Sequence, residues 1–356
     1  MANTRQEMLR AIRESPDDDG LRLSLADWLD ENGEPDFAEF IRLEVEAESL
    51  PEEDSRRRIL KNQADLRRRK ATTYPKLERG IMETRRGLPH YLQADVFDLL
   101  KHKDRFAPYC SRLFVHLHGG SGAAQTAEKE FAAGGPDKVG DALSELFAST
   151  WVRQWSVLGL DGVRLTDNRI RQMVSSSHLA GLERLAITDG ADDGAVRVLS
   201  ETPLPGLIAL SLTEVMRRCA WDESLLTSAV VSILLAAPLL NQLESLTLWG
   251  DWLGADELLA IAASERLANL EQLSLWPRLG TGEAVRELLQ SKSLANLKRL
   301  DHSRIPLDAA TVALLVRAET LPALCELEIH SDDKTHRKAL EARFGDGLVM
   351  GPVGDV

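Results

Sequence analysis

The residues best suited to chemistry are two histidines and a serine near the end of a predicted strand. His116 and His118 stand two positions apart, so both imidazoles lie on one face of that strand and form a possible metal-binding pair. A zinc site needs at least a third protein ligand, and none follows at a defined spacing. Ser121 lies among glycines, but Ala123 occupies the position where the GxSxG nucleophile motif requires glycine. Hydrolysis by His116, His118 and Ser121 is therefore the least supported of the functions considered, and no metal site is expected.

Other signatures of catalysis are missing from the sequence. It contains no Walker A, GxGxxG, HExxH or EF-hand motif. Asp27 beside Trp28 and Glu39 beside Phe40 could suggest an acid and base pair, but carboxylates at such helix positions are typically exposed or cap the helix. We expect no enzymatic activity and no cofactor.

Composition describes an ordinary globular chain. Of the 356 residues, 44% are hydrophobic and 28% are charged, which is enough for a sizeable core. Cys110, Cys219 and Cys325 are far apart and show no CxxC spacing, so we predict that they are buried as small apolar side chains. No apolar signal segment and no apolar window of about 18 residues occurs, so we expect a soluble, cytoplasmic protein.

Charge is unevenly distributed along the chain. The net charge of −13 argues against nucleic acid or an anionic membrane as the main partner. Residues 1–54 carry a net charge of −12, residues 55–86 carry +9 and residues 87–356 carry −10. The basic segment predicts a helix over residues 55–71. This helix either neutralises the acidic helix before it or forms a docking surface for an acidic partner.

Apolar residues at helical spacing predict three short helices before the basic helix. The apolar positions are Met8, Leu9 and Ile12 in the first helix, Leu21, Leu25, Trp28 and Leu29 in the second, and Phe37, Phe40, Ile41 and Val45 in the third. The breaks between these helices are Ser15-Pro16 and Asn32-Gly33. The sequence therefore predicts a compact helical module over residues 1–86.

Part of this module resembles a known family. The string ADWLDENGEP over residues 26–35, followed by AEFIRL over residues 38–43, is similar to the repeat-companion domain, which precedes repeat arrays in some bacterial proteins. The resemblance covers roughly residues 5–50. It implies a bacterial protein with a repeat array downstream, and it brings no catalytic activity.

A repeated pattern follows in the rest of the chain. The motif LxxLxL begins at Leu182, Leu207, Leu243, Leu270 and Leu324, with altered copies at Trp155 and Leu297. Successive copies are 27, 25, 36, 27, 27 and 27 residues apart, and amphipathic segments such as 257–263 and 283–289 lie between them. One strand and one helix in each repeat resemble leucine-rich repeats of the ribonuclease-inhibitor-like class. The resemblance implies an α/β solenoid, a horseshoe with parallel strands on its concave face and helices on its convex face.

The predicted array covers residues 87–335 in about nine repeats. Its first two repeats are atypical, with strands at Leu92-Ala94-Val96 and Leu113-Val115-Leu117, and residues 336–356 form a C-terminal cap. The asparagine that usually follows the strand in such repeats is absent, since Asp251 and Arg278 take its place.

Alternation along each strand identifies the residues expected on the concave face. The outermost column contains Asp161, Thr188, Thr213, Trp249, Trp276, Ser303 and His330, and the next contains Gly159, Ala186, Ser211, Thr247, Ser274, Asp301 and Glu328. Trp249 and Trp276 share a register and, with Trp252 and Trp221 nearby, predict an aromatic binding patch. Alternatively each tryptophan fills a widened turn against the next repeat, and for Trp252 this structural role is the expectation.

Two irregular segments are further candidates for function. The 36-residue repeat contains an insertion at residues 214–222, in which Arg217, Arg218 and Trp221 would suit an acidic, aromatic-accepting partner. The glycine-rich stretch 119–135 is predicted to be a mobile loop that a protease could cut.

The sequence thus predicts a non-enzymatic binding module or scaffold that recognises a protein partner through its concave face. The predicted partner-binding residues are Trp249, Trp276, Thr247, Ser274, Asp301, Glu328, His330, Asp161, Arg217, Arg218 and Trp221. An alternative is an inhibitory subunit that sequesters an effector protein, or a protease, and releases it when the glycine-rich loop is cleaved. No nucleic acid or membrane partner is expected.

Overall fold

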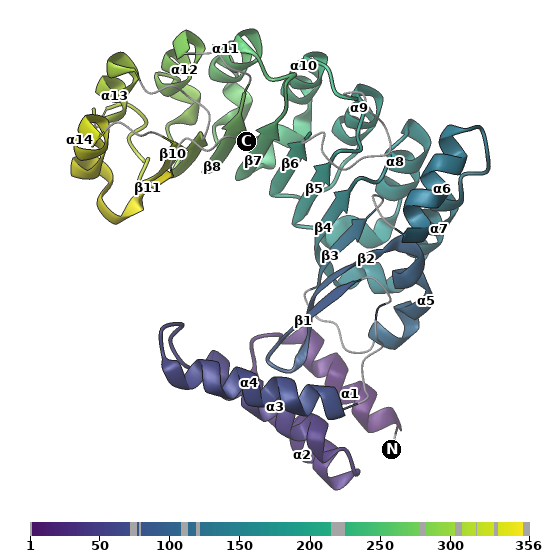
Figure 1. Cartoon of the computed structure of the whole chain (residues 1–356). Coiled ribbons are helices and arrows are strands. Elements are labelled where there is room, and N and C mark those ends of the chain that lie inside the picture. Colours follow the sequence, from purple (N-terminus) through teal and green to yellow (C-terminus); the bar gives the residue numbers. More distant parts are fainter. Residues whose placement is uncertain are drawn as a thin grey trace. The chain divides into compact units, whose positions relative to one another are not determined.

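The computed structural model describes residues 2–71, 77, 80–107, 113–118, 122–214, 225–277, 282–302, 308–317, 319–330 and 334–351 (Figure 1). These residues form a mixed α/β structure with 14 α-helices and an eleven-stranded, mostly parallel sheet, in which strand order follows chain order. The predicted α/β class is confirmed. The chain divides into two compact units, Met1–Gly159 and Leu160–Val356.

The first unit begins with four helices. They are α1 (Ala2–Glu14), α2 (Asp19–Glu31), α3 (Pro35–Glu48) and α4 (Ser55–Lys70). Asp18 caps α2 by accepting the backbone N–H of Gly20, and Asp54 caps α4 by accepting that of Arg56. The three short helices predicted from apolar spacing and the helix predicted from the basic segment are confirmed.

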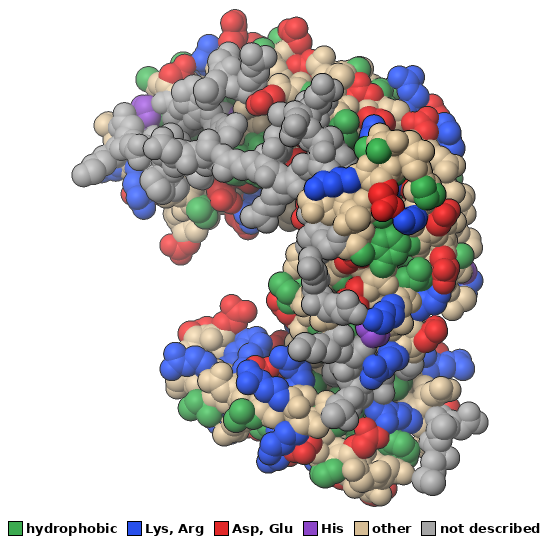
Figure 2. All heavy atoms as spheres, turned by 45° about the vertical axis from the view of Figure 1, so that its right-hand side comes forward, with side chains coloured by type: hydrophobic (Ala, Val, Ile, Leu, Met, Phe, Trp, Pro, Cys, Tyr) green, Lys and Arg blue, Asp and Glu red, His purple; other side chains and the backbone are tan. Residues whose placement is uncertain are grey.

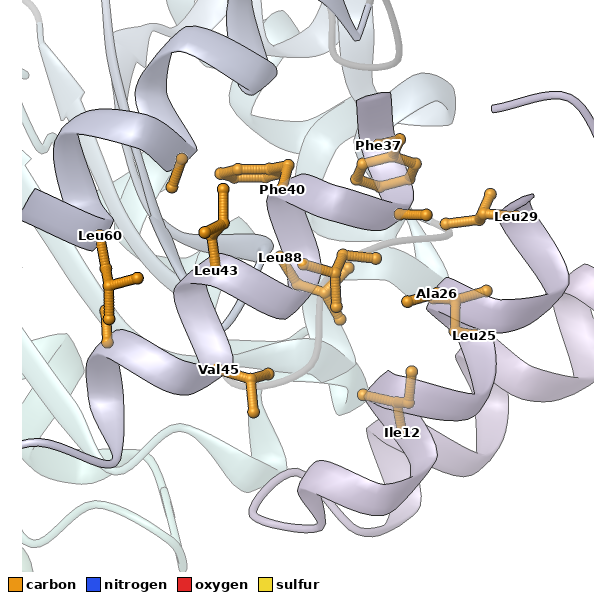
Figure 3. Packing of buried hydrophobic residues seen from close by; sticks show 14 of the residues in the cluster. Ile12, Leu25, Ala26, Leu29, Phe37, Phe40, Leu43, Val45, Leu60 and Leu88 are labelled. Atoms are coloured by element: carbon orange, nitrogen blue, oxygen red, sulfur yellow. The ribbon is translucent and has the colours of Figure 1, made fainter. Parts of the chain in front are cut away.

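The core of the helical bundle joins all four helices. Figure 3 shows Ile12, Leu25, Phe37 and Phe40 converging, with the rings of Phe37 and Phe40 stacked at 6.2 Å between centroids. Leu88, which follows the helices in the sequence, is buried in the same cluster. The bundle therefore shares its core with the strand to which Leu88 belongs.

The remainder of the first unit alternates strands and helices. Its elements are β1 (Ile81–Arg85), β2 (Leu88–Asp95), α5 (Val96–Phe106), β3 (Leu113–His118), α6 (Gly122–Ala132), α7 (Lys138–Ala148) and a 3₁₀ helix at Thr150–Gln154, and β4 (Trp155–Asp161) then begins in this unit. Strands β1 and β2 form an antiparallel hairpin, and β2 pairs with β3 in parallel. The domain boundary predicted at residues 86 and 87 falls in the turn of this hairpin, and the predicted domain limits remain predictions.

Two local predictions in this unit are wrong. Val96 was expected in a strand, but Asp95 accepts the backbone N–H of Phe97 at 2.8 Å and starts helix α5 there. The segment 119–135 was expected to be a loop, but residues 122–132 form helix α6, in which Ala124 and Ala127 are buried. Alanine favours helix strongly, and this preference outweighs the flanking glycines. Residues 119–121 lie outside the described residues.

The second unit repeats one strand and one helix. Its elements are α8 (Asp167–Val174), β5 (Arg184–Thr188), α9 (Asp193–Glu201), β6 (Ala209–Thr213), α10 (Ala229–Ala236), β7 (Ser245–Trp249), α11 (Ala255–Ala263), β8 (Gln272–Trp276), α12 (Gly282–Leu289), β9 (Arg299–His302), α13 (Ala309–Leu315), β10 (Glu326–His330), α14 (Lys334–Phe344) and β11 (Leu348–Gly351). Short 3₁₀ helices lie at Ser177–Gly181, Pro238–Gln242, Glu265–Leu267, Lys292–Leu294 and Gly345–Gly347. Figure 1 shows helices α9 to α13 side by side along one side of strands β5 to β10. The strand and helix alternation predicted from the 27-residue spacing is confirmed for these repeats.

Leucines of the repeated motif hold each strand against its helices. Leu246 and Leu248 on β7 are buried, as are Leu273 and Leu275 on β8, and these pairs lie in register. Burial of one leucine side chain contributes about 1.5–3 kcal/mol to folding, so each of these four leucines stabilises the unit appreciably.

Hydrogen bonds between repeats recur at fixed places. The carbonyl of Glu244 accepts the backbone N–H groups of both Glu271 and Gln272, and the carbonyl of Glu271 accepts those of Lys298 and Arg299 in the next repeat. The repeats therefore share one backbone geometry.

Side-chain amides add a second series of bonds at the 3₁₀ turns. Asn269 donates to the backbone oxygen of Asn241 at 2.6 Å, and Asn296 donates to that of Ala268 at 2.7 Å. The sequence lacked asparagine after the strands, and these residues supply an asparagine ladder before them instead.

Cysteine placement differs from the prediction. Cys325 is exposed, and its thiol lies 3.5 Å from the backbone oxygen of Lys298, so the expectation that it is buried is wrong. The residue directly precedes strand β10 (Glu326–His330). Cys110 and Cys219 lie outside the described residues. None of the described helices has both the length and the apolar character needed to cross a bilayer.

Candidate binding face

Strands β7 to β10 carry polar and aromatic side chains on the side opposite their buried leucines. We call these residues the strand face: Ser245, Thr247, Trp249, Gln272, Ser274, Trp276, Arg299, Asp301, Glu326 and Glu328. All of them are half-buried or exposed, whereas the residues between them on the same strands are buried. This alternation is the one predicted from the sequence, and it aligns Thr247, Ser274, Asp301 and Glu328 across four neighbouring strands.

Two tryptophans form the apolar part of the strand face. Trp249 and Trp276 pair in register on β7 and β8, and their rings lie 4.3 Å apart with a 33° angle between planes. Both are half-buried, so part of the aromatic surface stays accessible. The predicted register is confirmed, and the two rings lie together on one surface.

Trp252 has a different position from the pair. It is only 6% exposed, and its indole lies so close to Gly250 that a side chain at that position would collide with it. The structural role expected for Trp252 is confirmed, and this residue does not extend the exposed patch. Trp221, the fourth tryptophan of the predicted patch, lies outside the described residues.

Asp301 lies on β9, the strand next to that of Trp276, and is in register with Ser274. Asp301 accepts the hydroxyl of Ser274 at 2.9 Å, which fixes one of its oxygens on the strand face. A hollow of about 220 Å³ opens here between Thr247, Ser274, Arg299 and Asp301. The hollow is lined mainly by polar groups, so it suits a polar or charged group of a partner.

A second hollow follows along the same face. Arg299 donates to Glu328 at 2.9 Å and to Glu326 at 3.4 Å. These three side chains, with Asp346 and Val349, line a space of about 330 Å³. Three carboxylates of the strand face stand against the single guanidinium of Arg299, so the described residues of this part of the face carry an excess of negative charge.

Other predicted site residues are more dispersed. Thr188 and Thr213 share a hydrogen bond of 2.9 Å between their hydroxyls, and Asp161 is half-buried at the end of β4. Gly159 is buried, and a side chain there would collide with the imidazole of His116. Gly159 was expected on the concave face by its register, and its burial differs from that expectation. Ser303, Arg217, Arg218 and the side chain of His330 lie outside the described residues, although the backbone of His330 pairs with Gly351.

The residues of the hydrolase hypothesis are only partly described. His116 lies on β3, and its ring is 5.6 Å from that of Tyr91. Ser121 and the side chain of His118 lie outside the described residues. Within the described ranges, no group of three or more His, Cys, Asp or Glu side chains is arranged to hold a metal ion.

A second aromatic cluster was missed in the sequence. On β2 and β3, the rings of His90 and Phe114 lie 4.4 Å apart, and Tyr91 pairs in register with Phe114. All three are half-buried. Tyr91 and Phe114 alternate with the buried Leu92 and Val115, and that alternation was the signal available in the sequence.

Helix α4 neutralises the acidic helix α3. Arg56 pairs with Glu46 at 2.8 Å, and Arg57 and Lys61 pair with Glu48 at 3.1 and 3.0 Å. Burial alone would raise the pKa of Glu48, but the neighbouring cations outweigh it and hold that pKa below its ordinary value. Figure 2 shows Lys and Arg side chains gathered over these N-terminal helices. These ion pairs agree with the neutralising interpretation, and the alternative, a docking surface for an acidic partner, stays a prediction.

One repeat contains a buried histidine at a leucine position. His302 takes the place of the third leucine of its motif, is 1% exposed, and has no hydrogen-bond partner for either ring nitrogen among the described residues. Removal from water lowers the pKa of His302 to about 3. The imidazole is therefore neutral at physiological pH and packs as a core side chain.

No known protein family matches the chain, and neither does any curated protein. The candidate site consequently rests on the residues of the strand face and their geometry.

Proposed function

We propose that this protein is a non-enzymatic binding module that recognises a protein partner through the strand face. The Trp249 and Trp276 pair carries the proposal. Tryptophan is among the residues that contribute most to binding energy at protein interfaces, and two adjacent, partly accessible rings on a sheet face offer an anchor for a partner. An interface of the usual size, about 1,200–2,000 Å² in total, would cover several neighbouring strands.

The proposal includes the architecture suggested by the sequence. In it, the second unit is part of a leucine-rich-repeat solenoid and the helices before it are a repeat-companion module, in a bacterial cytoplasmic protein. The uniform strand and helix order and the repeated hydrogen bonds from one repeat to the next support this architecture. In such a solenoid the strand face is the concave surface.

The sequestering alternative receives less support. It required a cleavable loop over residues 119–135, and residues 122–132 of that segment are helical. A protease needs an extended segment, which a helix provides only after it unfolds.

The test compares two faces of the same unit. Trp249→Ala/Trp276→Ala removes the pair, and Leu259→Ala/Val316→Ala removes two exposed apolar side chains elsewhere in the unit. Proteins captured from a cell extract by the full chain are quantified for the parent and both double variants. We expect at least a tenfold loss of a specific captured protein with the tryptophan variant and little change with the other. Equal recovery by all three proteins would overturn the proposal.

A further inference from the structure

The strand face contains an aromatic ring and a carboxylate, those of Trp276 and Asp301, that a single side chain of a partner could contact together. Trp276 lies on β8, and Asp301 lies on the neighbouring strand β9, opposite Ser274, which is two residues before Trp276. Neighbouring strands are about 4.8 Å apart and two residues advance about 6.6 Å along a strand, so the two backbone positions are separated by roughly 8 Å. A long side chain from a partner can therefore contact the ring and the carboxylate at once.

Arginine fits this combination best. Its planar guanidinium stacks on aromatic rings and binds a carboxylate through two parallel hydrogen bonds. A cation within about 6 Å of a tryptophan ring is attracted by the ring electrons. A lysine ammonium could satisfy the charge but would not stack, and an acidic side chain would be repelled by Asp301 and Glu328.

The charges farther along the face favour the same partner. Arg299 pairs with Glu326 and Glu328, and the strand face as defined above contains three carboxylates, those of Asp301, Glu326 and Glu328, for this one cation. Like charges facing each other across an interface disfavour wrong partners, while complementary charges speed association. The two hollows, of about 220 and 330 Å³, give cationic groups room to approach these carboxylates.

We propose that the strand face selects a protein segment in which an arginine stands next to an aliphatic or aromatic side chain. The apolar side chain covers the Trp249 and Trp276 pair, and the guanidinium reaches Asp301. From β7 to β10 the face spans about 14 Å, the length of four or five extended residues, so a short segment is sufficient. This inference rests on the proposed function and specifies the chemistry of the partner.

The experiment is a selection of random dodecapeptides displayed against the full chain. We expect the selected peptides to be enriched in arginine beside Leu, Ile, Phe, Tyr or Trp. Their affinity, measured by calorimetry on synthetic copies, should fall at least tenfold with Asp301→Asn/Glu328→Gln. Asparagine and glutamine keep the oxygens that accept from Ser274 and Arg299, so these variants should fold, and thermal unfolding checks this.

A matched control separates local contact from overall charge. Asp256→Asn/Glu265→Gln removes the same number of negative charges at exposed positions outside the strand face. The affinity should then change less than twofold. A larger loss with this control than with Asp301→Asn/Glu328→Gln would overturn the inference.

The remaining outcomes distinguish this inference from the proposed function. Peptides that need Trp249 and Trp276 but show no excess of arginine would overturn the inference and leave the strand face as a binding site. Peptides that bind Trp249→Ala/Trp276→Ala as tightly as the parent, or a selection without any enrichment, would overturn both.

Discussion

Asn269 donates its side-chain amide to the backbone oxygen of Asn241, and the 2.6 Å bond links the turns of two successive repeats. Asn296 makes the equivalent bond to Ala268 one repeat farther on. In a chain built of repeats, stability depends largely on such contacts between neighbours, because each repeat buries its apolar face only against the next.

The first prediction concerns this ladder. Asn269→Asp keeps the size of the side chain but replaces the donor with an acceptor facing a carbonyl. We expect the free energy of unfolding to fall by about 1 kcal/mol, the usual contribution of one hydrogen bond. Urea unfolding followed by circular dichroism measures this change in the free energy of unfolding. An unchanged unfolding midpoint would show that water replaces the hydrogen bond with no loss of stability.

His302 predicts a pH dependence of stability. Its pKa is about 3 in the folded chain and close to 6.5 when unfolded, so the unfolded state binds more protons between these values. The stabilisation that neutral His302 gives is complete above pH 6.5 and is lost as the pH falls towards 3. At pH 5 the loss is on the order of 2 kcal/mol.

Replacement of His302 by leucine tests whether this histidine causes the pH dependence of stability. Leucine occupies the equivalent position at Leu248 and Leu275, so His302→Leu should pack in the core and remain uncharged at every pH. We expect the difference in unfolding free energy between pH 7 and pH 5 to shrink by roughly 2 kcal/mol in this variant. The same pH dependence in both proteins would contradict the assignment to His302.

Replacement of Gly87, in the turn between β1 and β2, should strongly lower the stability of the protein. Gly87 has a φ of +77°, and a side chain there would collide with Ile41 on α3. Gly134 has a similar φ of +85° but open space around it. Gly134→Ala should therefore cost about 1 kcal/mol of left-handed strain, and Gly87→Ala should cost several times as much. Differential scanning calorimetry compares them, and equal shifts in Tm would contradict the close packing of the turn on α3.

Buried and accessible tryptophans should respond differently to truncation. Trp252→Ala leaves a cavity at a buried site and should lower the free energy of unfolding by about 3–5 kcal/mol. Trp249→Ala removes a half-buried ring and should cost markedly less. Guanidinium unfolding of both variants measures the difference, and equal losses of unfolding free energy would mean that the half-buried Trp249 is mainly structural.

Much of this fold could be predicted because the buried leucines recur at a fixed spacing in the sequence. The leucines at 246, 248, 273 and 275 are buried, and their spacing alone identifies the strands, their register and the residues opposite them. The alignment of Trp249 with Trp276 follows directly from that register.

Other features depend on contacts that spacing does not encode. The glycines around residue 120 suggested a loop, yet Ala124 and Ala127 pack in a helix. The ion pairs of Arg299 with Glu326 and Glu328 join neighbouring strands at positions that are polar on all four strands from β7 to β10, so nothing in the sequence distinguished them beforehand.

Leu88 gives the first unit a property that neither the bundle nor the hairpin has alone. It belongs to strand β2 but is buried among the side chains of the helices, and the backbone N–H of Gly87 beside it donates to Glu44 on α3 at 3.4 Å. Opening the hairpin would expose the bundle core, and opening the bundle would leave Leu88 in water. The amide protons of β2 and α3 should therefore exchange with solvent in a single cooperative event, so that the hairpin and the helices act as one foldon.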